Sequence, residues 1–123
     1  MKPLTFDAWR DGTYLPLTEI LLVLGKYTID LSWSLEIGDI APEPGASALE
    51  ARAKSGQPMS TVEMLDYFSP SLQIIDGTME GTDSKGNKVV TIKAVDSTSW
   101  DISTTLEGIN RELKERFSAK EIE

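Results

Sequence analysis

The side chains with the most chemical potential in this sequence are carboxylates in the middle of the chain. Between Tyr27 and Ser84 there are ten Asp and Glu residues and only two bases, Arg52 and Lys54. Acids and bases balance in the flanking segments, so this central block accounts for the formal net charge of −8. A negative field of this kind attracts cationic partners and repels nucleic acid and anionic lipid. The block therefore predicts a basic protein partner rather than a particular reaction.

We expect the partner-binding residues to lie where predicted loops and strand faces display these acids: Asp30, Glu36, Asp39, Glu43, Asp66, Asp76, Glu80 and Asp83. The stretches from Tyr27 to Ala51 and from Ser55 to Ser84 contain no compensating base. The alternative interpretation is a solvated acidic surface that only keeps the protein in solution.

The sequence contains no histidine and no cysteine. The commonest general base and metal ligand are therefore missing, and thiolate chemistry and disulfides are excluded. A hairpin loop at 83–87 places Lys85 where a calcium loop would need an oxygen ligand. We therefore predict no metal and no cofactor.

Carboxylate pairs are the main catalytic option that remains. Two carboxyl groups about 5–10 Å apart serve as acid and base in glycoside hydrolysis. Asp76, Glu80, Asp96 and Asp101 lie on or beside neighbouring predicted strands and are the candidates. No sign of a buried, perturbed pair accompanies them, so the prediction is that the protein is not an enzyme.

Three tryptophans differ in their predicted surroundings. Trp33 and Trp100 fall on apolar strand faces and are expected in the core. Trp9 lies between Asp7 and Arg10, which marks it as a candidate exposed anchor.

The elements that must position these groups are typical of an α+β fold. Apolar residues occupy every odd position from Tyr27 to Ile37, and this period of two predicts a long, half-buried strand that presents Asp30 and Glu36 together. In all, we expect about four mainly antiparallel strands, at 27–37, 72–80, 88–95 and 99–103. Helices at about 16–24, 60–68 and 105–117 should pack on one face of the sheet.

Local signals refine this prediction. Capping boxes are expected at Ser60–Glu63 and at Thr104–Glu107. Gly77 is expected at a β-bulge, and Gly108 in a close contact between the last helix and the sheet. The segment 46–54 is expected to form a brief helix, and 4–9 either a strand or a helical turn.

A chain of 123 residues predicts a single domain spanning 1–123. No apolar run approaches the roughly 20 residues needed to span a bilayer, and no signal peptide is visible. These features predict a cytoplasmic protein that binds neither membrane nor nucleic acid, and they leave homo-oligomerisation open.

The leading functional hypothesis is a small acidic inhibitor, most concretely an immunity-type protein that neutralises a cationic toxin such as a nuclease. A related version is an inhibitor that imitates DNA. The alternatives are a small carboxylate-dependent enzyme, and a subunit or adaptor that uses an exposed sheet edge.

Overall fold

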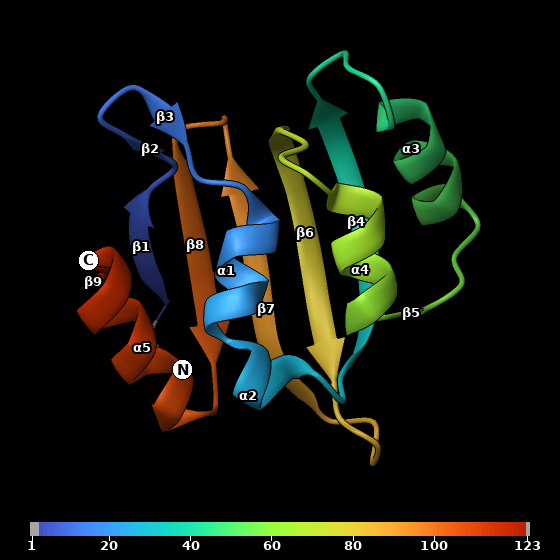
Figure 1. Ribbon diagram of the computed structural model, residues 1–123. Coiled ribbons are helices and arrows are strands. Elements are labelled where there is room, and N and C mark those ends of the chain that lie inside the picture. The colour runs from blue at the N-terminus through green and yellow to red at the C-terminus, as the bar shows by residue number, and fades with distance from the viewer. Residues whose placement is uncertain (1–2, 123) are drawn as a thin grey trace.

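In the computed structural model, which describes residues 3–122, a seven-stranded antiparallel sheet forms the centre of the molecule (Figure 1). The strands follow one another in the spatial order β5 (Met59–Ser60), β4 (Ser32–Ile40), β6 (Ile74–Thr82), β7 (Lys88–Val95), β8 (Ser99–Thr104), β1 (Leu4–Asp7) and β9 (Lys120–Glu121). A separate ribbon pairs β2 (Trp9–Arg10) with β3 (Thr13–Tyr14). The α+β class and the antiparallel sheet are thus confirmed, whereas the expectation of about four strands is wrong.

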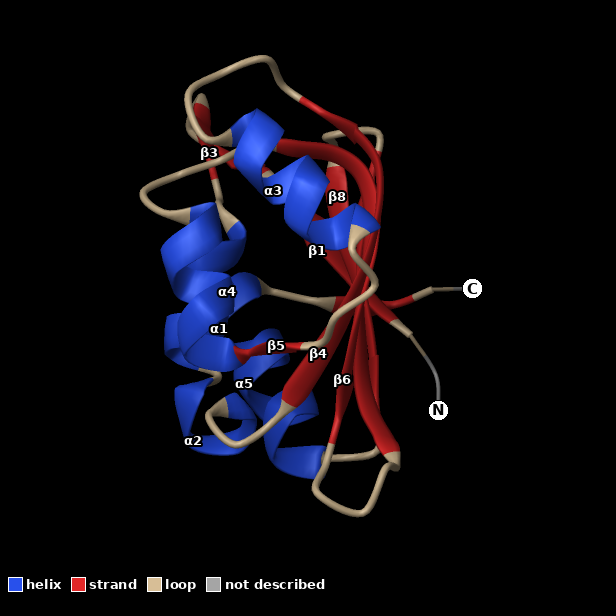
Figure 2. Ribbon diagram, turned by 90° about the vertical axis from the view of Figure 1, so that its right-hand side faces the viewer, coloured by secondary structure: helices blue, strands red, loops and turns tan. Residues whose placement is uncertain are grey.

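The helices lie on one face of the sheet and leave the other face open (Figure 2). They are α1 (Leu17–Val23), α2 (Gly25–Thr28), α3 (Ala46–Lys54), α4 (Thr61–Phe68) and α5 (Glu107–Phe117). Among residues 3–122, no helix is long and apolar enough to cross a membrane.

One hydrophobic core fills the space between the sheet and the helices. Trp33, Met79 and Ile102 on the sheet and Met64 and Leu113 on the helices are all fully buried. Both predicted core tryptophans, Trp33 and Trp100, belong to it.

Buried polar groups join the two layers on the helical side. The Trp33 indole N–H donates to the Thr61 hydroxyl at 2.8 Å, and that hydroxyl donates to the Thr28 carbonyl. This chain of bonds ties β4, α4 and α2 together and satisfies each buried donor.

The first long strand begins later than predicted. Tyr27 and Thr28 belong to α2, and Ile29 is exposed, so the alternation is strand-like only from Ser32 onward. The ring of Tyr27 packs against Gly108 of α5, where a Cβ atom would lie 2.4 Å from the ring. Of the odd positions before Leu31, Tyr27 is therefore apolar because it packs between helices, and Ile29 is exposed. Asp30 lies in the turn before β4, so it does not share a strand face with Glu36.

Two local predictions also need correction, and a third is located more closely. At α5 the Ncap residue is Leu106 and no side chain caps it, because the Thr104 hydroxyl accepts the Leu106 N–H rather than that of Glu107, and donates to the Val89 carbonyl. Gly108 contacts Tyr27 rather than the sheet. The irregularity expected at Gly77 is present directly beside it: after the Gly77–Ile37 pair, Gly38 of β4 and then Ile75 of β6 are the extra residues before Ile74 pairs with Ile40.

Other local predictions are confirmed. The capping box at Ser60 and Glu63 is complete, with both bonds at 3.1 Å. The predicted helix at 46–54 is α3. The segment at 4–9 contributes β1 and the start of β2.

Candidate partner-binding site

Four carboxylates gather at one end of the sheet, the upper end in Figure 1. They are contributed by the end of β4, the loop after it, the start of β6 and the turn between β7 and β8. We call this group the acidic rim: Asp39, Glu43, Asp76 and Asp96.

The irregular end of β4 brings an acid of β4 next to an acid of β6. Asp39 is the cross-strand partner of Asp76, between two register shifts. Gly38 lies so close to Asp76 that an added Cβ would be 3.3 Å from the Asp76 carbonyl oxygen. Glycine at this position therefore allows the close approach of the two strands.

The β7–β8 turn adds the third carboxylate. Asp96 and Ser97 both have positive φ angles, 53° and 60°, which reverse the chain. The Asp96 backbone N–H donates to Asp76 Oδ1 at 3.0 Å, and the Ser97 N–H donates to the Ile75 carbonyl at 2.8 Å. The turn is thereby fixed against the start of β6.

Glu43 reaches the rim from the loop after β4. Its Oε2 accepts the Gln73 backbone N–H at 3.3 Å. Its negative charge acts on the pKa of Tyr14, whose hydroxyl accepts the Ile74 N–H at 3.3 Å. Burial raises the pKa of Tyr14 to about 12; the Ile74 bond opposes this shift and the negative Glu43 adds to it.

No rim carboxylate is neutralised by a base in the described part of the chain. The ion pairs in residues 3–122 join Arg52 to Glu63, Lys88 to Glu80 and Arg116 to Glu112. All three pairs lie elsewhere, so the charge of the rim is directed to solvent.

Trp9 stands next to the rim. Its side chain is 43% exposed, and its indole N–H donates to the Ser97 carbonyl at 2.7 Å. Its ring tilts against Tyr14, with ring centres 5.4 Å apart. The exposure expected for Trp9 from the sequence is confirmed, and the bond to Ser97 places the ring beside Asp96.

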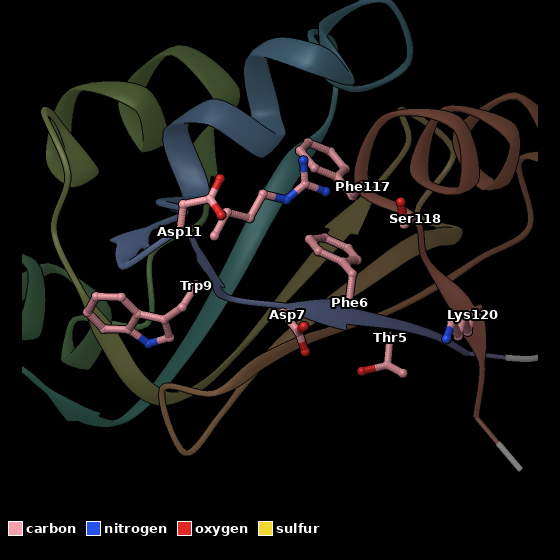
Figure 3. Close-up of a pocket in the computed structure, with 9 residues that line it drawn as sticks. Thr5, Phe6, Asp7, Trp9, Asp11, Phe117, Ser118 and Lys120 are labelled. Carbon is pink, nitrogen blue, oxygen red and sulfur yellow. The ribbon is translucent and has the colours of Figure 1, made fainter.

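A hollow of about 470 Å³ lies on the other side of Trp9 (Figure 3). Phe6 and Phe117 stack there with ring centres 4.9 Å apart, and the Arg10 guanidinium lies 5.3 Å from the Phe117 ring centre. Arg10 also donates to the Arg116 carbonyl at 3.2 Å. The two rings are buried beneath Arg10, so the hollow presents mainly the Arg10 cation and polar side chains to a partner, and it is wide enough to receive a partner side chain.

The structure brings together only some of the predicted binding residues. Asp39, Glu43 and Asp76 form the rim, whereas Glu36 lies on the open face of the sheet. At the opposite end Glu80 pairs with Lys88 at 2.7 Å. The remaining three lie apart: Asp30 in the α2–β4 turn, Asp66 on the solvent side of α4, and Asp83 in the β6–β7 hairpin.

The four candidate catalytic carboxylates are likewise divided. Asp76 and Asp96 meet at the exposed rim, and Glu80 is held by Lys88. Asp101 lies on the open face, where it accepts bonds from Thr5 and Ser99. In residues 3–122 no three His, Cys, Asp or Glu side chains are grouped so as to hold a metal ion.

Asp96 and Trp9 complete a site that sequence reasoning only partly found. Asp96 lies outside the acidic block in sequence, and only the pairing of β6 with β7 brings it to Asp76. The polar neighbours of Trp9 were the available signal for its exposure.

No family model matches the chain, and neither a curated protein nor a solved structure is significantly similar to it.

Proposed function

We propose that this protein is a small acidic inhibitor that binds a basic protein partner through the acidic rim and Trp9. In its most concrete form it is an immunity-type protein that neutralises a cationic toxin, such as a nuclease. The observation that carries the proposal is the set of four carboxylates, none paired with a base in the described chain, beside an exposed tryptophan.

The two parts of the site have different roles in this proposal. Unpaired surface charges accelerate encounter with an oppositely charged partner and fix its orientation. A large aromatic side chain provides the buried contact that slows dissociation. On a nuclease, the rim carboxylates would occupy the positions that phosphates take in the substrate groove, and Trp9 would pack at its margin.

The test compares three forms of the full chain. The rim variant carries Asp39→Asn, Asp76→Asn and Asp96→Asn. A control variant loses the same charge elsewhere, through Glu19→Gln, Glu107→Gln and Glu115→Gln. Each form is immobilised and exposed at low ionic strength to a fractionated lysate of the source cells, and retained proteins are identified by mass spectrometry.

The proposal expects one basic protein that wild type and the control variant retain and the rim variant does not. The purified partner should then lose its catalytic activity at a 1:1 ratio with wild type, and association should slow steeply as salt rises. Equal retention by all three forms, or binding indifferent to salt, contradicts the proposal.

A further inference from the structure

A row of alternating charges crosses the open face of the sheet. Cross-strand pairing places its members side by side from β4 to β9, one residue from each strand: Glu36, Thr78, Lys93, Asp101, Thr5 and Lys120. We call this set the charged row. It shares no residue with the acidic rim, although Asp76 of the rim lies one step above Thr78 on the same face.

The charges of this row are available to a partner. The helices cover only the opposite face (Figure 2), and Glu36, Lys93 and Lys120 are exposed. Asp101 accepts hydrogen bonds from the hydroxyls of Thr5, at 2.6 Å, and Ser99, at 3.3 Å. Within residues 3–122 no charged member of the row forms an ion pair.

The order of the charges is self-complementary. From β4 to β9 the row contains an acid, a threonine, a base, an acid, a threonine and a base. A two-fold axis parallel to the strands, placed between β7 and β8, sets this row against its own reverse. Lys93 then faces Asp101 of the second copy, Glu36 faces Lys120, and Thr78 faces Thr5.

We infer that the open face binds a second copy of this chain, forming a face-to-face dimer through the charged row. Packed sheets lie about 10 Å apart, which Lys and Asp side chains can bridge. Packed sheets cross at about 30°, so the Lys93–Asp101 contacts nearest the axis are the best aligned.

The size of the face predicts a weak dimer. The seven strands contain 40 residues in all. At about 3.3 Å along the strand and about 4.8 Å between strands, they present roughly 630 Å². That area is below the 800 Å² or so that each partner buries in a standard interface. The contacts are polar and include no aromatic anchor, so we expect a dissociation constant in the high-micromolar range.

One contact opposes this dimer. The same rotation brings Asp7, which pairs with Ser99 one step above the row, opposite Asp76 of the second copy. Like charges facing each other weaken association. Asp7→Asn should therefore tighten the dimer, a result opposite in sign to that of the row substitutions.

The test uses sedimentation velocity on the full chain over a range of concentrations. Wild type should dimerise, and Lys93→Glu and Asp101→Lys should each weaken self-association by about tenfold or more, because each places like charges opposite each other twice. An equimolar mixture of the two variants should dimerise again, since the new glutamate of one chain faces the new lysine of the other. Matched controls are Lys85→Glu and Glu115→Lys, alone and mixed, which should behave as wild type.

Circular dichroism establishes that each variant is folded. A wild-type chain that stays monomeric at all concentrations overturns the inference, as does a mixture no more associated than its separate components. Because the acidic rim is intact in these variants, either result leaves the proposed inhibitor function standing.

Discussion

The two ends of the sheet carry similar acids and use them differently. At the upper end Asp39, Glu43, Asp76 and Asp96 have no base within ion-pair distance in the described chain. At the lower end Glu80 pairs with Lys88, and Asp83 Oδ1 accepts the backbone N–H groups of Lys85 and Asn87 at 2.9 and 3.0 Å. Acid content alone therefore does not identify a binding surface. The difference lies in pairing with a base, because carboxylates at both ends accept backbone N–H groups: Asp39, Glu43 and Asp76 do so at the upper end.

The largest expected effect is on partner binding at the upper end. Trp9→Ala should weaken the partner complex by about 30-fold or more, about 2 kcal/mol, as the loss of a central aromatic contact does. Isothermal titration calorimetry measures it. Trp9→Phe retains most of the ring and should lose less; equal affinities for wild type and Trp9→Ala would remove Trp9 from the site.

Substitutions in the lower half of the sheet should change the free energy of unfolding. A Cβ atom on buried Gly81 would lie 2.9 Å from a Val90 methyl carbon and 3.2 Å from the Trp33 ring. Gly81→Ala should therefore destabilise the fold by about 1–3 kcal/mol in urea unfolding. Gly38→Ala, at the exposed rim, should cost less than Gly81→Ala. Gly25→Ala is the control, because nothing lies within 4 Å of its added Cβ.

The pKa of Tyr14 depends in part on the charge of rim residue Glu43. Because its pKa in the folded state is about 12, above its ordinary value of 10.0, the folded protein holds this proton more tightly than the unfolded chain. Stability should be unaffected below about pH 10 and fall as the pH rises from there through about 12. Tyr14→Phe removes this dependence. Glu43→Gln should lower the Tyr14 pKa, as followed by ultraviolet absorbance; an unchanged titration contradicts the influence of the rim charge.

The smallest expected effects are on the midpoint of thermal unfolding, and they should differ in sign between the two ends of the sheet. Hydrogen bonds from the Asn87 and Lys85 backbone N–H groups hold the pKa of Asp83 below its ordinary value. Its contribution to stability is present above the ordinary carboxyl pKa and is lost as the pH falls through the lowered value. Asp83→Asn should lower the midpoint of thermal unfolding by a few degrees. Asp76→Asn should leave it unchanged or raise it slightly, because the amide oxygen can still accept the Asp96 N–H while repulsion within the rim is relieved. A loss at both ends would contradict the comparison.

Periodicity located the long central elements. The predicted strand at 88–95 coincides with β7, and the helix predicted at about 105–117 is α5, which buries Ile109, Leu113 and Phe117. The short strands β5 and β9 contain two residues each, too few for a period to appear. They are strands because tertiary contacts place them beside β4 and β1.

The candidate site was predictable in charge but not in position. The acidic block indicated a basic partner, yet it could not separate Asp76, which reaches the rim, from Asp83, which closes a turn. That distinction depends on pairing between distant strands and on which backbone N–H groups each carboxylate accepts. Asp96 joins the rim through the same long-range pairing.

Because the three tryptophans are unequally buried, their intrinsic fluorescence can report on binding and on unfolding separately. Trp33 and Trp100 are 0% and 1% exposed, whereas Trp9 is 43% exposed. Collisional quenchers in water should reach Trp9 first, so the quenchable fraction of emission would follow occupancy of the site without any label. The remaining emission would change only when the core opens, and one spectrum would then separate docking from denaturation.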